Sequence, residues 1–188
     1  MGVSAEDDWQ EVSEARAGAL ATVLGPSDGM VFHARHPFAL GGTADVLGFF
    51  QHLPGAVYVT AELTGKPNAC YADYELMICH RAPSDWGPNV ISRLAAYTQQ
   101  AYLGAGETMD IDEATPRDSR IKAYLFDTYG TFTLFGHDFE LRLCLGITKR
   151  ELQFKMDHGP EKLLQQLKRH GVYPYTDLDR ESVPLDNE

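Results

Sequence analysis

Two glutamates near the middle of the chain offer the clearest candidate chemistry. Glu62 lies in residues 57–63 and Glu75 in residues 74–80, and both runs have the composition and spacing of β-strands. If these strands pair, the two carboxylates can share one face of a sheet at a separation suited to glycoside hydrolysis. A carboxylate-based hydrolase that uses Glu62 and Glu75 is therefore one hypothesis for this chain.

No other catalytic motif accompanies the two glutamates. The sequence has no glycine-rich phosphate loop, no G-x-S-x-G elbow and no H-E-x-x-H pair. Alternating strands commonly turn such carboxylates toward solvent, where they do no chemistry. We therefore expect no catalytic residue, and we predict that the chain is not an enzyme.

A cluster of tyrosines and acids surrounds the same glutamates and indicates a docking surface. Tyrosine is enriched at protein interfaces, and an acidic face attracts a basic partner. The net charge of −11 agrees with such a partner, although it also serves solubility. The predicted partner-binding residues are Tyr58, Glu62, Tyr71, Asp73, Tyr74 and Glu75.

A metal site can be imagined at His33 and His36, with Asp45 as a third ligand. The segment precedes Pro37 and should be irregular, so a spacing of three residues does not bring both rings to one side. We expect surface or capping histidines here, and neither a metal nor another cofactor.

Charge and hydropathy exclude several other classes of function. An acidic chain without a local basic patch repels the phosphate backbone, so no nucleic acid is expected as a partner. The apolar runs are a few residues long, far short of the roughly 20 that cross a bilayer. The N-terminus carries Glu6, Asp7 and Asp8 where a secretory signal would be positive. We therefore expect a cytoplasmic protein that does not span a membrane.

The elements that must position these residues follow from periodicity and from Gly and Pro punctuation. A single α+β domain over residues 1–188 is predicted, with helices packed on a largely antiparallel or mixed sheet. An N-terminal helix over about 5–24 would have Ser4 as its N-cap, and an acidic tail would cover 179–188. The other predicted helices cover 88–103, 149–157 and 160–170, and the strands cover 44–50, 57–63, 74–80, 121–126, 131–135 and 139–147, with a last extended segment over 172–178.

Two helix starts carry specific local signals. Thr148 and Glu151 have the spacing of a capping box, and Pro160 suits the first turn of the next helix. In the central helix the side chains expected to be buried are Val90, Ile91, Leu94, Ala95, Tyr97, Ala101 and Tyr102. Trp86, just before that helix, is either an exposed anchor or a staple at its entry, and we favour the staple.

Seven motifs follow one another along the chain. They are GGTADV (41–46), YVTAEL (58–63), YELMIC (74–79), ISRLA (91–95), GETM (106–109), LCLGIT (143–148) and GVYPYTDL (171–178). In this order they resemble the Suppressor of fused family in its bacterial, single-domain form, and the resemblance covers about residues 38–183.

The resemblance implies the mixed α+β fold of the N-terminal domain of the animal protein, which sequesters Gli-type transcription factors in Hedgehog signalling. The chain ends before a second domain, and residues 65–73 differ from the animal form, so Gli binding is not implied. Bacterial members resemble immunity proteins, which neutralise a toxin by binding it. The acidic charge would suit a basic toxin such as a nuclease. A third hypothesis is a module that forms homo-oligomers through an edge strand, and the oligomeric state stays open.

Overall fold

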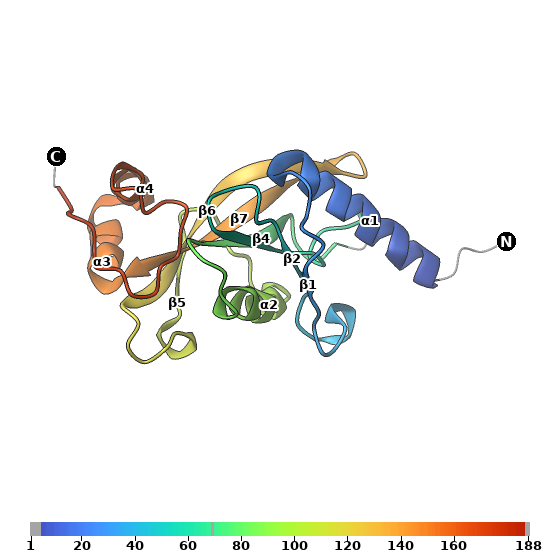
Figure 1. The fold of residues 1–188 in the computed structure, drawn as a ribbon, viewed down its shortest axis with the longest axis horizontal. Helices are drawn as coiled ribbons and strands as arrows, with labels where there is room; N and C mark the ends of the chain where they lie inside the picture. Colours follow the sequence, from blue (N-terminus) through green and yellow to red (C-terminus); the bar gives the residue numbers. More distant parts are fainter. Residues whose placement is uncertain (1–4, 69, 187–188) are drawn as a thin grey trace.

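The computed structural model describes residues 5–68 and 70–186, in which one mixed sheet is flanked by helices on both faces (Figure 1). The strand order is β1-β2-β3-β4-β7-β6-β5, and every neighbouring pair is antiparallel except β4 and β7. This architecture confirms the predicted α+β class. The strands are β1 Val31–Phe32, β2 Val46–Gly48, β3 Ala56–Thr60, β4 Tyr74–His80, β5 Thr108–Asp110, β6 Ile121–Leu134 and β7 His137–Thr148.

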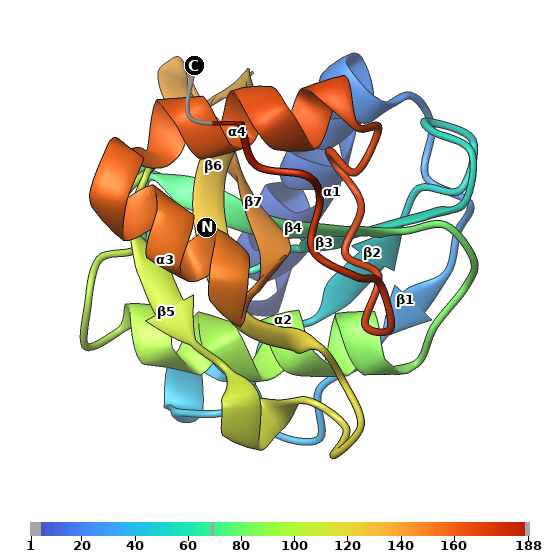
Figure 2. The same ribbon diagram turned by 90° about the vertical axis from the view of Figure 1, so that its left-hand side faces the viewer.

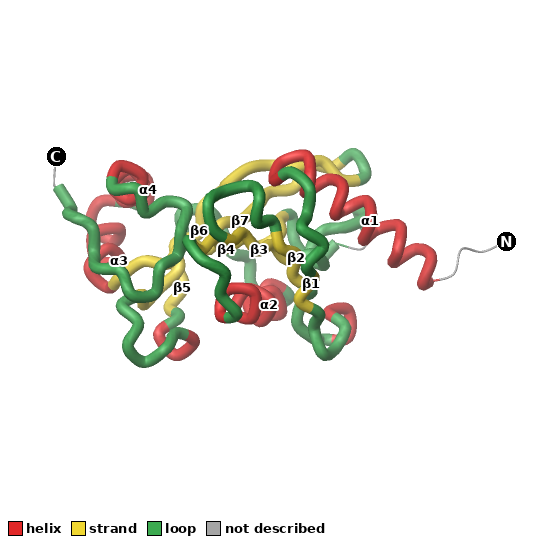
Figure 3. The backbone as a smooth tube through the Cα atoms, in the orientation of Figure 1, coloured by secondary structure: helices red, strands yellow, loops and turns green. Residues whose placement is uncertain are grey.

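The helices divide into two layers, one on each face of the sheet. Helices α1 (Ala5–Leu24), α3 (Lys149–His158) and α4 (Pro160–Arg169) cover one face, and α2 (Trp86–Thr98) covers the other (Figures 1 and 2). Two short 3₁₀ helices, η1 (Phe38–Leu40) and η2 (Asp112–Ala114), lie in the loops on the α2 side (Figure 3). Each layer has its own apolar core, and the sheet separates the two.

The central strands are buried on both faces because helices cover both. All five residues of β3 and all seven of β4 are buried. Such strands do not show the alternation of inward and outward side chains that a sheet with one wet face shows. Polar residues in β3 and β4 therefore face the interior, and several residues that were predicted to lie at the surface are buried.

The longest hairpin of the sheet is formed by β6 and β7. Its loop consists of Phe135 and Gly136, which both have positive φ, as a two-residue turn of the primed type requires. The prediction of two separate strands over 121–126 and 131–135 was wrong. Near Gly130 the register shifts between Thr128 and Gly130, so the glycine marks an irregularity in a continuous strand.

The C-terminal helices begin as their sequence signals predict. Thr148 accepts a hydrogen bond from the amide of Glu151, and the Glu151 carboxylate accepts one from the amide of Thr148, which confirms the capping box. Pro160 occupies the first turn of α4. Residues 172–178 do not form a strand and contribute only an isolated bridge between Tyr175 and Cys79.

Two other predictions concern helix ends. Helix α1 spans the predicted residues, and the predicted cap Ser4 lies outside the described residues. Helix α2 ends at Thr98, so the prediction that it continues to residue 103 was wrong. Within the described residues, no helix combines the length and the apolar composition needed to cross a bilayer.

Candidate functional site

The Glu75 side chain lies in the interior of the domain. It is 0% exposed, and one of its oxygens accepts hydrogen bonds from the amides of Leu63 and Thr64, at 3.0 and 2.9 Å, and from the Thr64 hydroxyl at 2.8 Å. The other oxygen accepts one from the Thr60 hydroxyl at 2.6 Å. With its oxygens occupied and no access to solvent, Glu75 cannot touch a partner, which corrects its place in the predicted docking surface.

A buried arginine from α1 completes this network. The Arg16 Nε atom lies 3.4 Å from the Glu75 carboxylate and donates to the Thr64 carbonyl at 2.9 Å, and its Nη1 atom donates to the Ala61 carbonyl. Burial raises the pKa of Glu75, while Arg16 and the threonine donors act in the opposite direction. The network fixes α1 to the β3–β4 loop, so its role is structural.

Glu62 lies just beyond β3 and is half-buried. Its carboxylate accepts a hydrogen bond from the Asp45 amide at 2.8 Å, and burial raises its pKa. Glu62 lines a small pocket of about 190 Å³, whereas Glu75 does not. A glycosidase needs both carboxylates open to the same substrate. The arrangement therefore does not provide the hydrolase site that the sequence allowed.

Two tyrosines of the predicted surface are also buried. Tyr58 in β3 packs edge-on against Phe32 and Phe50, and its hydroxyl accepts a hydrogen bond from the Ser84 amide at 3.1 Å. Tyr74 in β4 accepts one from the Leu103 amide at 3.1 Å and lies beneath the Arg142 guanidinium. Neither ring can contact a partner, which corrects these two assignments as well.

Tyr71 and Asp73 are exposed. Tyr71 packs edge-on against Phe38 and lines the same small pocket as Glu62, together with Arg16 and Lys66. Asp73 does not line that pocket; it accepts a long hydrogen bond of 3.4 Å from the Tyr102 hydroxyl. The structure thus brings Glu62 and Tyr71 together and leaves Asp73 apart from them.

The histidine segment takes up a different arrangement from a metal site. His33 Nδ1 lies 2.9 Å from the Asp45 carboxylate, which also accepts a hydrogen bond from the Ala34 amide at 2.7 Å. His36 does not join this pair. No cluster of three or more potential metal ligands exists among residues 5–68 and 70–186.

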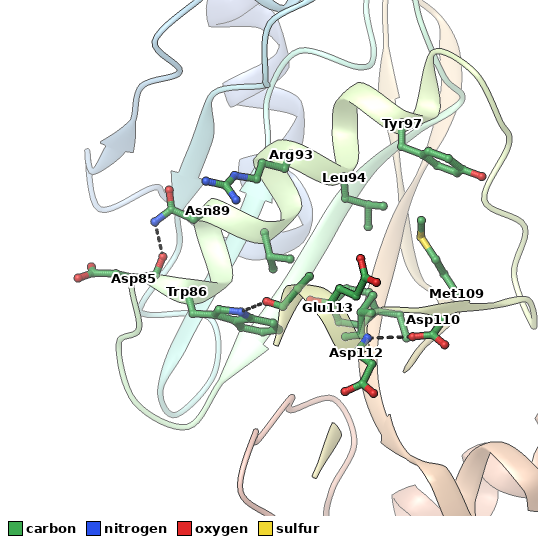
Figure 4. Close-up of a pocket in the computed structure, with 14 residues that line it drawn as sticks. Asp85, Trp86, Asn89, Arg93, Leu94, Tyr97, Met109, Asp110, Asp112 and Glu113 are labelled. Carbon is green, nitrogen blue, oxygen red and sulfur yellow. Dashed lines mark hydrogen bonds between the residues drawn. The ribbon is translucent and has the colours of Figure 1, made fainter. Parts of the chain in front are cut away.

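A groove between α2 and the β5–η2 segment is a larger concave site, with a volume of about 1020 Å³ (Figure 4). Along one wall, α2 presents residues one turn apart on a single side of the helix, and β5 with η2 forms the opposite wall. Apolar side chains line the interior of the groove. They are Trp86, Val90, Leu94, Met109 and Ile111.

Carboxylates surround this apolar interior. Asp85 precedes α2, and Asp110, Asp112 and Glu113 lie on the opposite wall, while Arg93 is the one cationic residue that lines the groove. Asp112 pairs with Lys122 at 2.6 Å, and the other three carboxylates form no ion pair within the described chain. The rim is therefore negative, in keeping with the charge of the whole chain.

Tyr124 of β6 lines the groove and carries an unsatisfied polar group in the interior. The side chain is fully buried, and its hydroxyl has no hydrogen-bond partner among the described residues. Burial raises its pKa well above the usual value, so the hydroxyl stays neutral and can both donate and accept. An unpaired buried hydroxyl is costly to the fold.

Trp86 connects the two walls at one end of the groove. Its Nε1 atom donates a hydrogen bond to the Ala114 carbonyl at 3.0 Å (Figure 4). Trp86 is the first residue of α2, so it holds the helix start against η2. Trp86 therefore links the start of α2 to η2, whereas the staple favoured from the sequence would pack against the following turn of its own helix.

The groove was not predicted from the sequence. Tyr97 was expected to face inward but is 42% exposed and lines the groove, and Tyr102 is 60% exposed. The sequence signal for the groove was a second stripe of large side chains on α2, formed by Trp86, Val90 and Tyr97. The opposite wall of the groove gave no such signal, because residues 105–114 contain only three strand residues and a 3₁₀ turn.

Comparison with known proteins places the fold among solved SUFU structures. The Sufu-Fu complex crystal structure matches with a TM-score of 0.74 and 14% identity, covering 91% of both chains. A putative SUFU homologue from Neisseria gonorrhoeae matches with a TM-score of 0.69 and 18% identity, covering 92% of this chain and 97% of that one. Drosophila Suppressor of Fused matches with a TM-score of 0.70 and 14% identity, covering 90% of this chain and 50% of that chain.

The sequence comparisons agree with the fold. No curated protein sequence matches the chain. The family model of the Suppressor of fused protein (SUFU) matches residues 54–181, which is more than half of the chain and lies within the region expected from the motifs. The order of motifs, the fold and the family match agree, and this chain belongs to the Suppressor of fused family.

Proposed function

We propose that this chain is a non-enzymatic protein-binding domain whose α2–β5 groove holds a basic segment of a partner protein. The acid-rimmed groove with an apolar interior carries this proposal. Interfaces commonly combine an apolar centre with a polar rim, and opposite charges at the rim steer association. A segment with an apolar side chain flanked by lysine or arginine would match both features.

The sheet edge beside the groove supports the same function. β5 is an edge strand, and within residues 5–68 and 70–186 no strand pairs with its outer side. An unpaired edge can accept an extended segment through main-chain hydrogen bonds. One solved SUFU structure is a complex with Fu, so protein binding agrees with membership of the family.

The acidic character of the chain guides the choice of partner. At a net charge of −11, the chain favours a basic partner. We propose that the partner is a basic toxin domain in the cytoplasm, and that this chain acts as an immunity protein that neutralises the toxin by occupying its surface.

The partner-binding residues predicted from the sequence that are not fully buried form a second candidate contact surface. Glu62 and Tyr71 line a pocket beside Trp9, which is 61% exposed, and Asp73 is exposed near Tyr102. Large exposed aromatic side chains are common interface anchors. This surface is a second candidate for partner contact, and it differs from the groove in having Lys66 and Arg16 beside its acids.

Capture of the partner from lysate of the source cells, with a matched pair of variants, tests the groove. The variant Asp85→Lys/Glu113→Lys reverses one charge on each wall, and Glu14→Lys/Asp157→Lys makes the same change on α1 and α3, which lie on the opposite face of the sheet. None of these four residues forms an ion pair within the described chain.

We expect a basic protein that wild type and the α1/α3 variant capture at low salt and that the groove variant does not. Capture should weaken as salt rises, because exposed charges are screened. A partner retained equally by the groove variant would contradict the use of the groove. A captured protein without toxic activity would contradict the immunity role and leave protein binding in place.

A further inference from the structure

A second concave site lies on the other side of α2 and has the opposite charge. It has a volume of about 530 Å³ and is formed by the segment after β1, the glycine turn after η1 and the first half of α2. Its lining includes Arg35, Arg93, His33 and His36. The chain has 27 acidic residues, yet no aspartate or glutamate lines this pocket.

The two arginines have their guanidinium groups free. Neither Arg35 nor Arg93 forms an ion pair or a side-chain hydrogen bond with another described residue, whereas Arg16, Arg142 and Arg180 are all paired. Both free arginines are exposed. Figure 4 shows the Arg93 guanidinium turned away from Glu113 and toward Asn89, which also lines the basic pocket.

The loop that carries the pocket is fixed by short contacts. The amide of Gly42 donates to the Pro37 carbonyl at 3.0 Å, and a Cβ atom at this position would lie 2.0 Å from the His36 carbonyl oxygen. Ser92 of α2 donates to the Ala44 carbonyl at 2.5 Å, and the Ala44 amide donates back to the Ser92 carbonyl at 3.2 Å. The loop and the helix therefore hold the two sides of the pocket at a fixed separation.

Other donors are available within the pocket. His33 is held by Asp45, which itself does not line the pocket, and the half-buried Thr43 hydroxyl has no partner among the described hydrogen bonds. His36 is likewise unpaired there. Guanidinium, imidazole and hydroxyl donors around one cavity are the groups that bind a tetrahedral oxyanion.

We propose that this basic pocket binds the phosphate group of a small molecule, with Arg35 and Arg93 as its principal ligands. Its volume lies in the range of small-molecule sites. The net charge of −11 opposes a long polyanion such as a nucleic acid, but a local basic pocket can still hold one or two phosphates. This site shares Asn89 and Arg93 with the edge of the acidic groove, but the proposal does not depend on the function proposed for that groove.

Titration with inorganic phosphate, pyrophosphate and ADP at constant ionic strength tests the proposal. Binding is measured by calorimetry and by the shifts of backbone amide NMR signals. We expect saturable binding with shifts in residues 33–43 and 88–93. Arg35→Ala should weaken binding about tenfold or more, because it removes charged hydrogen bonds. Arg117→Ala, at an exposed arginine outside the pocket, should bind as wild type does.

The three probes distinguish the possible sources of the phosphate. Equal affinity for phosphate and ADP would indicate a site for the free ion, and tighter binding of ADP would indicate a phosphorylated metabolite. No saturable binding, or equal binding by wild type and Arg35→Ala, would overturn the proposal. Arg35→Gln provides a second variant, and thermal melting confirms that each variant is folded. Arg93 also lines the acidic groove, so Arg35 separates the two sites.

Discussion

At the scale of single residues, charged groups stabilise this domain from within. Glu75, Arg16, Glu151 and Arg142 are all buried, and Glu151 binds Arg180 through both carboxylate oxygens at 2.6 Å. The sequence showed Glu75 but not its surroundings, because its partner Arg16 lies 59 positions earlier in the chain, on another element. Local patterns carry no information on such distant partners.

Glu75→Gln should destabilise the fold by about 3 kcal/mol or more, because it leaves Arg16 as an uncompensated buried charge and places an amide among hydrogen-bond donors. Urea unfolding measures the change in the free energy of unfolding. Asp73→Asn, at an exposed position, should change it by less than about 0.5 kcal/mol. A loss below about 1 kcal/mol for Glu75→Gln would contradict the structural role of the network.

His80 should make stability depend on pH. Burial lowers its pKa from 6.5, and its Nδ1 atom donates to the Thr176 carbonyl at 2.8 Å while Nε2 has no partner among the described residues. A lowered folded pKa means that the contribution of His80 is present above pH 6.5 and is lost as the pH falls below it. His52 acts in the same direction, since burial lowers its pKa too.

The raised pKa values of Glu62 and Glu75 act in the opposite direction, so the comparison with a variant isolates His80. Between pH 7.5 and 5.5, His80→Gln should lose less unfolding free energy than wild type. Urea midpoints at both pH values give this difference. Equal losses in wild type and variant would show that His80 has the same pKa in the folded and unfolded states, and would contradict the prediction.

At the scale of elements, the sequence predicted most of what is local. The capping box at Thr148, the start of α4 at Pro160 and the extent of α1 needed only neighbouring residues. Errors arose where tertiary structure decides. Helices on both faces buried Tyr58, Tyr74 and Glu75, and the β7 partner kept β6 continuous past Gly130.

The packing of α2 on the sheet gives an element-scale prediction with a built-in control. At Gly87 a Cβ atom would lie 2.3 Å from His80 Nε2, so Gly87→Ala should cost about 1–3 kcal/mol through overpacking. At Gly18, an exposed site in α1, a Cβ atom meets nothing within 4 Å. Gly18→Ala should therefore stabilise the helix by about 0.5–1 kcal/mol.

Thermal or urea unfolding of both glycine variants measures these opposite effects. A neutral or stabilising Gly87→Ala would show that the start of α2 can move away from His80. In that case the groove wall would be adjustable, and its geometry would not be fixed by the packing of α2.

At the scale of the whole molecule, the two faces of the sheet differ in how completely they are covered. Among the described residues, three α-helices cover one face, while α2 covers the other (Figure 2). An acidic groove lies on one side of α2 and a basic pocket on the other. The sequence predicted the fold class, and the basic charge of the partner stays a prediction. It did not predict the groove, because its two walls are brought together only by the sheet.

The whole-molecule account depends on where a partner binds, and hydrogen–deuterium exchange measures that directly. The captured partner would be purified and bound to the full chain, and amide exchange would be compared in the free and bound forms. We expect added protection in Trp86–Thr98 and in residues 108–114, the two walls of the groove. Protection confined to residues 8–16 and 62–73, with the groove walls unchanged, would contradict the account and assign binding to the Trp9 and Tyr71 surface.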